Sequence, residues 1–358
     1  MKRKILALSL MISALLAVAV RPVTAGPGNG LVPTNMEAKF AIQGDVGADI
    51  EFLERRQADG SLKRYALVGM MGHGLNIIDI TNPDLPVLTG VAVDPGFNWE
   101  ADIQVNPKRN LAIIATESPG ATVGNGANGG LAFVDLTNLS MPTVVGHITL
   151  TGGAHNVTIV DDQYVYGLLP TNIVDYTNPA APVFKKPAPQ ICGHDLTLDL
   201  NRPGIAYSSC PSSSNALQIV NVADPLNPVI IKNINNNKIS IGHQADPSVD
   251  SSFVVVTDER GGGLTYEKCP GGGLHIYDIS GKYVAGASLS NPKLMGNYFA
   301  PFYDMTGDST KETQWGNCTI HVLTLQSERN LMSVGHYSAG SFIADLSAPT
   351  KTTGGIYQ

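Results

Sequence analysis

The sequence has few charged and few aromatic residues: 15% of its 358 residues are Asp, Glu, Lys or Arg, and 6% are Phe, Trp or Tyr. It has no cluster of lysines or arginines, although nucleic acids and anionic membrane surfaces are bound through such clusters. We therefore expect no nucleic-acid partner.

Motifs that would identify an enzyme are also absent. The sequence has no G-x-S-x-G nucleophile elbow, no C-x-x-C pair of the kind that holds zinc, and no glycine-rich phosphate loop between a strand and a helix. Whether the protein is an enzyme is not decided by motifs of this kind.

Long apolar runs are missing except at the N-terminus. Basic residues at positions 2–4 precede an apolar run at 5–20, and small residues at 23–25 suit a signal peptidase. We predict that residues 1–25 are a cleaved signal peptide; the alternative is an uncleaved anchor, for which the run is a little short of the ~20 residues needed. After cleavage we expect no membrane span, and a secreted protein with a periplasmic or extracellular location.

The predicted mature chain is acidic. Residues 1–25 hold four basic and no acidic residues, so 19 basic residues then face 30 acidic ones, a net charge of −11. This charge favours solubility, and we expect a monomer.

What the sequence does contain in quantity is turn residues: 38 glycines and 23 prolines, beside 43% hydrophobic residues. This composition suits one large all-β domain. We assign residues 26–45 to a lead-in with a ring-closing strand near 36–43, and residues 46–358 to the domain itself.

Six times a short apolar run ends in Asp or Asn and is followed by small residues and usually a proline. The runs end at Asp79, Asp135, Asp175, Asn221, Asp278 and Asp345. β-branched residues favour a strand, whereas Asn, Asp and Pro end it in a turn. A period of about 40–65 residues suits a four-stranded propeller blade. We predict a β-propeller with six blades; the alternative is a seven-bladed relative that lacks its last blade.

These signatures, such as GLNIIDITNPDLPV (74–87) and ALQIVNVADPLNPV (216–229), resemble the LVIVD-repeat family of β-propellers. The resemblance extends over nearly the whole mature chain, and it implies a propeller fold but little about activity. Members of the family often continue into a seventh blade, which this sequence does not show.

Four cysteines in an exported chain predict disulfides. Within one blade, Cys192 begins the first strand and Cys210 ends the second, so antiparallel pairing brings them together. That leaves Cys269 for Cys318. Free thiols are the alternative.

Aligning the innermost strands places histidines in one column. The column reads Ala48, Ala101, His155, His194, His243 and His321, and the next one reads Asp49, Asp102, Asn156, Asp195, Gln244 and Val322. Equivalent residues of successive blades form a ring at one mouth of the channel. Imidazole is a preferred ligand of Cu and Zn, and carboxylates beside it orient its ring. The four histidines are therefore candidate metal ligands.

The second strand of each blade returns to the same mouth, with three long loops at 118–130, 260–273 and 300–317. It brings further polar residues to the rim. We expect Glu117, Asp258, Glu259 and His336 there, beside Asp49, Asp102 and Asp195.

Two functions remain open. The first is a binding or scaffold protein with a ligand site at the channel mouth, in which the polar column serves only to bond neighbouring blades. The second is a metal-dependent oxidoreductase or hydrolase. Its fold is then similar to that of the selenium-binding and methanethiol oxidase propellers, whose copper is held by histidines, although no repeat of that family is found.

Overall fold

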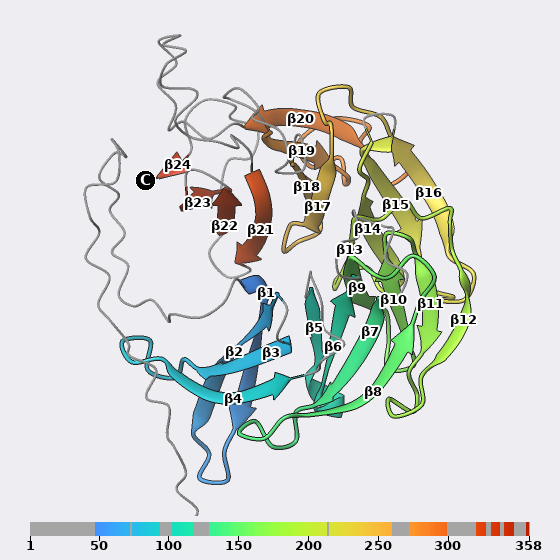
Figure 1. Cartoon of the computed structure of the whole chain (residues 1–358). Helices are drawn as coiled ribbons and strands as arrows, with labels where there is room; N and C mark the ends of the chain where they lie inside the picture. The colour runs from blue at the N-terminus through green and yellow to red at the C-terminus, as the bar shows by residue number, and fades with distance from the viewer. Residues whose placement is uncertain are drawn as a thin grey trace, which may run out of the picture.

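The computed structural model describes residues 47–71, 74–93, 102–117, 129–212, 215–259, 272–298, 320–326, 331–336, 340–346 and 356–357. These residues form six four-stranded antiparallel sheets around a central channel (Figure 1), so the predicted six-bladed all-β propeller is confirmed. Besides the strands, the described chain includes a short 3₁₀ helix, Pro107–Arg109.

Each blade is formed by four strands in chain order. Blades 1 to 3 are β1 (Gly47–Arg56), β2 (Leu62–Met70), β3 (Gly74–Asp79) and β4 (Val87–Val93); β5 (Ile103–Asn106), β6 (Leu111–Thr116), β7 (Gly130–Asp135) and β8 (Thr143–Thr149); and β9 (Asn156–Ile159), β10 (Tyr164–Leu168), β11 (Asn172–Asp175) and β12 (Val183–Pro187). Blades 4 to 6 are β13 (Asp195–Leu198), β14 (Ile205–Ser209), β15 (Leu217–Asn221) and β16 (Val229–Ile234); β17 (Gly242–Pro247), β18 (Phe253–Asp258), β19 (Leu274–Asp278) and β20 (Lys293–Tyr298); and β21 (Ile320–Gln326), β22 (Leu331–His336), β23 (Gly340–Asp345) and β24 (Ile356–Tyr357).

In blades 1 to 5, whose turns the structure describes, the repeated signature forms the outer hairpin, from the third strand through the turn to the fourth. The Asp or Asn that ends the third strand accepts a hydrogen bond from the main chain two residues later. Asp135 Oδ1 accepts from Thr137 N at 2.7 Å, and Asn221 Oδ1 accepts from Ala223 N at 2.9 Å. A second Asn or Asp, such as Asn138, makes the same contact in the turn. These side chains satisfy the turn main chain, which is why the motif recurs.

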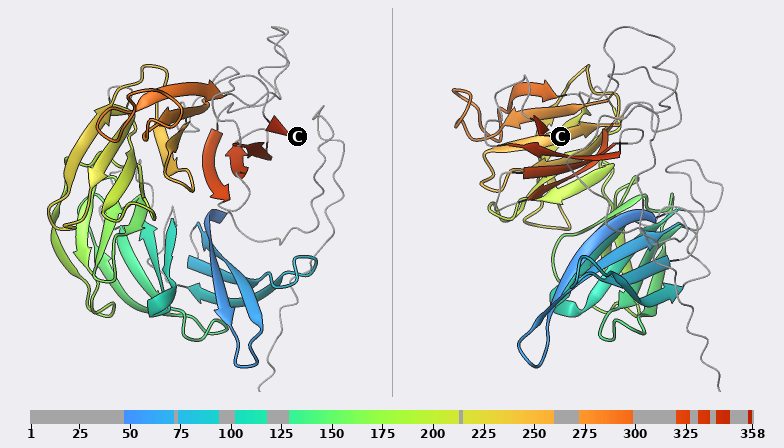
Figure 2. Two further views of the ribbon diagram at one scale, coloured as in Figure 1. Left: turned by 180° about the vertical axis from the view of Figure 1, so that it is seen from behind. Right: turned by 90° about the vertical axis from the view of Figure 1, so that its left-hand side faces the viewer.

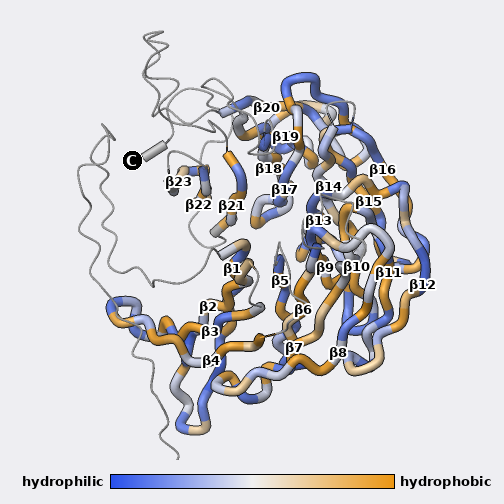
Figure 3. Tube along the Cα trace, viewed as in Figure 1, coloured by the Kyte–Doolittle hydropathy of each residue, from blue (hydrophilic) through white to orange (hydrophobic). Residues whose placement is uncertain are grey.

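The hydrophobic core lies between blades. Among the described residues, five apolar clusters each join two consecutive blades, as where Leu75 and Ile77 of blade 1 pack with Ile103 and Ile114 of blade 2. Figure 3 shows hydrophobic segments along β6 and β7, and Figure 2 shows the radial arrangement from behind and from the side. A blade cannot bury both faces alone, so consecutive blades stabilise each other.

The last blade takes its outer strand from the C-terminal segment, because β24 pairs antiparallel with β23. The ring-closing strand expected near residues 36–43 and the signal peptide lie outside the described residues. Among the described residues, no helix has the length and apolar character needed to cross a membrane.

The bridge predicted between Cys192 and Cys210 is present, with the two Cα atoms 5.3 Å apart. It joins the segment before β13 to the end of β14. Cys269 and Cys318 lie outside the described residues, and their pairing stays a prediction.

Candidate metal centre at one mouth of the channel

The four column histidines lie side by side at the start of the innermost strands. His155 and His194 directly precede β9 and β13, whereas His243 and His321 lie at irregularities in the pairing of β17 and β21. The ring centroids of His155 and His194 are 4.6 Å apart. The two following spacings, His194 to His243 and His243 to His321, are both 4.0 Å. Four imidazoles thus form one continuous arc across blades 3 to 6.

Two glutamates from the second strands reach the ends of this arc. Glu117 Oε1 lies 3.1 Å from Nδ1 of His155. Glu259 lies between two histidines, with Oε2 at 3.8 Å from His243 Nε2 and Oε1 at 3.7 Å from His321 Nε2. Both carboxylates are buried. The structure therefore brings these two rim residues to the histidines.

The other two rim residues behave differently. Asp258 Oδ1 accepts hydrogen bonds from the main-chain nitrogens of Ser240 and Ile241, at 3.0 and 3.1 Å, so it orders the segment before β17. His336 is buried at the end of β22 and pairs with Ile320. Burial lowers the pKa of His336 to about 4.

Three groups of the cluster lie close enough to share an ion: one ligand atom each from His194, His243 and Glu259 lies within 4.8 Å of the others. Ligand atoms on a tetrahedral zinc, at ~2.0–2.1 Å from the metal, lie about 3.4 Å apart. Side-chain rotations that move these atoms by an ångström or so would bring them to that spacing.

The two central histidines have lowered pKa values. Burial lowers the pKa of His194 and His243 well below the usual value for histidine, and the neighbouring imidazoles lower it further. A hydrogen bond with the backbone of His243 partly opposes this lowering of the pKa of His194. The rings are therefore neutral at physiological pH, which is the form that binds metal. Within the described chain, Nδ1 of His194 and Nδ1 of His243 are buried and make no hydrogen bond. A buried polar atom without a partner costs free energy, and an ion bound at that atom would remove the cost. The nitrogen of His243 that lies 3.8 Å from Glu259 Oε2 is the other one, Nε2.

The neighbouring column bonds blades together. Asp49 Oδ2 accepts from Ile103 N at 3.2 Å, and Asp102 Oδ2 accepts from Val157 N at 2.7 Å. Gln244 Oε1 likewise accepts from Leu323 N in blade 6, at 2.8 Å. Two of the three column carboxylates thus bond the main chain of the next blade, as the alternative interpretation of this polar column requires.

The third carboxylate of that column, Asp195, lies close to other carboxyl groups. Burial and the neighbouring Asp246 raise the pKa of Asp195 to about 7, and its Oδ1 accepts from Leu196 N. Burial and the charges of Asp49 and Asp195 also raise the pKa of Asp102 well above its usual value. The channel below the histidines is therefore rich in carboxyl groups.

The sequence did not lead us to a further set of polar side chains, which lies two residues beyond the Asp column on the inner strands. It consists of Glu51, Gln104, Thr158, Thr197 and Asp246. Alternate residues of a strand share a face, so the residues two positions after the Asp column could have been identified from that column. Thr158 Oγ1 donates to Leu196 O and Thr197 Oγ1 donates to Asp246 Oδ1, so it too joins blades.

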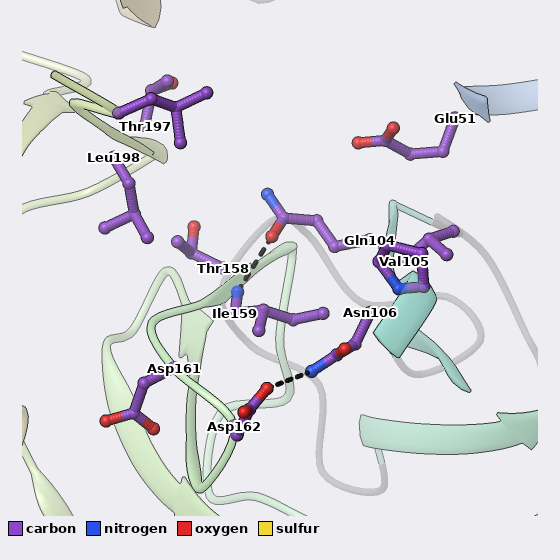
Figure 4. A pocket seen from close by; sticks show the side chains of 12 residues that line it. Glu51, Gln104, Val105, Asn106, Thr158, Ile159, Asp161, Asp162, Thr197 and Leu198 are labelled. Atoms are coloured by element: carbon purple, nitrogen blue, oxygen red, sulfur yellow. Dashed lines mark hydrogen bonds between the residues drawn. The ribbon is translucent and has the colours of Figure 1, made fainter. Parts of the chain in front are cut away.

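All of these side chains except that of Asp246 line a cavity of about 760 Å³ toward the end of the inner strands opposite the histidines. Figure 4 shows Glu51, Gln104 and Thr197 around the open space, with Asn106 and Asp162 hydrogen-bonded at its wall. Three carboxylates line the cavity, and no lysine or arginine is among its lining residues. This lining suits a neutral or cationic polar molecule and not an anion.

His275, on β19, lies outside the histidine column. It is fully buried; its Nδ1 lies 2.9 Å from Asn297 Oδ1, and its Nε2 makes no hydrogen bond in the described chain. Of the positions named from the sequence, Ala101 and most of the three long loops lie outside the described residues.

Comparison with known proteins gives the family of one repeat and the fold. The family model for the LVIVD repeat matches residues 63–93, which span β2 to β4. No curated protein matches the chain.

Among solved structures, a functionally unknown protein from Desulfotomaculum acetoxidans is similar at a TM-score of 0.59 and 12% identity, over 91% of this chain and 90% of that one. A putative 6-phosphogluconolactonase from Bacteroides fragilis has a TM-score of 0.58 and 11% identity, over 85% and 81%. The Cps50 (Swd1) propeller domain from Myceliophteria thermophila has a TM-score of 0.53 and 9% identity, over 86% and 85%. At such identities these likenesses show the fold alone. The chain therefore contains an LVIVD repeat, at residues 63–93, within a six-bladed β-propeller.

Proposed function

We propose that this propeller is an exported binding protein whose ligand is a transition-metal ion, held at the mouth of the channel by His194, His243 and Glu259. The observation that carries the proposal is the pair of buried, neutral imidazoles whose Nδ1 atoms make no hydrogen bond within the described chain. The His194 ring also hydrogen-bonds the backbone of His243 in blade 5, but that contact leaves Nδ1 of both rings without a partner in the described chain.

The remaining cluster residues support such a site from both sides. His155 with Glu117 flanks His194, and His321 also contacts Glu259. Two to three imidazoles with one carboxylate are a donor set that suits Zn²⁺ or Cu²⁺. The described disulfide suits an oxidising compartment, in keeping with the predicted signal peptide.

The proposal is tested by measuring metal on protein purified without chelators, followed by titration of the stripped protein with Zn²⁺ and Cu²⁺. We expect one tightly bound ion per chain. His194→Ala/His243→Ala should lose it while keeping the β-sheet circular dichroism spectrum. The matched control is His147→Ala, which removes an exposed histidine on β8 and should bind as the parent does. Parent protein that binds no metal, or a double variant that binds equally well, would contradict the proposal.

Catalysis at the same ion is the second candidate. Three protein ligands are the number found in catalytic zinc sites, which keep one position for water or substrate. A metal-dependent hydrolase should cleave an activated ester only when loaded, and an oxidoreductase should consume oxygen with a reduced substrate. Loaded protein inactive in both assays would leave the binding function alone.

The cavity at the opposite end offers no support for phosphorylated substrates. The Bacteroides fragilis neighbour is named for a phosphorylated lactone, and phosphate recognition relies on arginine, lysine or clustered main-chain N–H groups. The lining residues here include three carboxylates and no cationic side chain. We therefore do not transfer that activity to this chain.

A further inference from the structure

The disulfide lies at the base of the histidine cluster. Cys192 precedes His194 by two residues, and Cys210 directly follows Ser209 at the end of β14. Cys210 is fully buried and its Cα lies 5.3 Å from that of Cys192. The bridge therefore closes a covalent loop that contains one of the proposed ligands close to its start.

The main chain beside the bridge holds both central histidines. His194 N donates to Ser209 O at 2.8 Å. The hydroxyl of Ser209, itself fully buried, donates to His243 O at 2.5 Å. One dipeptide, Ser209–Cys210, thus contacts the backbone of a ligand from blade 4 and the backbone of a ligand from blade 5.

The contact with blade 5 is tight and continues to the third proposed ligand. Gly242 N donates to Cys210 O at 2.9 Å, and a Cβ on Gly242 would lie only 2.5 Å from Ala216 O. Such a close approach of two backbones leaves room for glycine only. Glu259 N in turn donates to Ile241 O at 2.8 Å, so the glutamate is tied to the same segment.

We propose that the Cys192–Cys210 bridge and Ser209 form a clamp that sets the separation of His194 and His243, and thereby the affinity for the metal. This inference rests on the proposed function. The physical reason is that ligands held in place by outer contacts lose less entropy on binding, and such contacts are worth about 10–100-fold in metal affinity. Without the bridge, the segment before β13 is joined to β14 by hydrogen bonds alone.

The test compares Zn²⁺ dissociation constants of the stripped parent, Cys192→Ala/Cys210→Ala and Ser209→Ala. Alanine is used so that no thiol replaces a ligand. We expect both variants to bind at least about 10-fold more weakly than the parent. Asp135→Ala is the matched control: it loses a turn bond at the end of β7 in blade 2, and lowers stability without touching the clamp in blades 4 and 5.

A second readout separates positioning from stability. The visible and electron paramagnetic resonance spectra of bound Cu²⁺ report the ligand geometry, and they should change in the clamp variants but not in Asp135→Ala. If the cysteine variant does not fold, Ser209→Ala, which keeps the bridge, decides alone. Parent affinity in every folded clamp variant, or equal weakening in Asp135→Ala, overturns the clamp; a parent that binds no metal overturns the proposed function instead.

Discussion

Glu51, on the innermost strand of blade 1, should make the protein less stable when it is ionised. Burial raises the pKa of Glu51 to about 7 from an ordinary 4.5, and the charges of Asp49 and Asp246 contribute. The folded protein therefore holds this proton more strongly than the unfolded chain does. Stability is fully present below pH 4.5 and is lost as the pH rises through about 7.

The magnitude follows from the shift. One pKa unit corresponds to 1.36 kcal/mol, so the shift of Glu51 gives an upper limit of about 3 kcal/mol at pH 8. Because the side chain is half-buried and water screens part of the interaction, we expect about 1–2 kcal/mol. For a protein of this size, the corresponding rise in Tm is about 2–4 °C.

Glu51→Gln keeps the shape of the side chain and removes the charge. We expect Tm to rise by that amount at pH 8 and to stay unchanged at pH 4, where glutamate is neutral in the folded state. Thermal unfolding followed by circular dichroism, in buffer with a chelator, measures both. The control on the same strand is Glu54→Gln, whose exposed side chain contacts Arg64 and should have little effect at either pH.

A double-variant cycle tests the cause. In an Asp246→Asn background one repelling charge is gone, so the gain from Glu51→Gln at pH 8 should shrink. The reasoning is refuted if Glu51→Gln gives no gain at pH 8, or gives the same gain at pH 4.

Two further predictions concern the outer strand of blade 2 and the N-terminus. Gly146→Ala should lower the free energy of unfolding by about 1–3 kcal/mol in a urea titration, because the added Cβ would lie 2.0 Å from Pro179 O in the turn of blade 3. An unchanged free energy of unfolding would show that the backbone shifts to make room. N-terminal sequencing of the exported protein should give Gly26 as the first residue, and Met1 retained in a membrane fraction would contradict the signal peptide.

The fold could be predicted from the sequence because one side-chain rule repeats six times. An Asp or Asn after a β-branched run ends the third strand, and in the five blades whose turn the structure describes it also bonds that turn. The pairing of Cys192 with Cys210 followed from this register as well. The outer strand of blade 6 could not be foreseen, since the two residues of β24 carry no period of their own.

The candidate site could be predicted only in part. Aligning repeats placed His155, His194, His243 and His321 in one column, and the structure places them in one arc. The alignment could not tell which polar column bonds the next blade, because that depends on which side chains face backbone N–H groups across a blade interface. It also gave no sign of the irregularities at His243 and His321, which depend on local pairing.

The aspartates and the histidines of the inner strands have different partners because they lie at different positions. Asp49 and Asp102 each accept a hydrogen bond from a main-chain N–H of the following blade, so these carboxylates have partners within the fold. The histidines lie one residue earlier, directly before β9 and β13 or at the irregular starts of β17 and β21. His155 contacts Glu117, whereas Nδ1 of His194 and Nδ1 of His243 make no hydrogen bond in the described chain. The two central rings, on neighbouring blades, each keep a buried Nδ1 without a partner in the described chain, which supports the ion site that we propose.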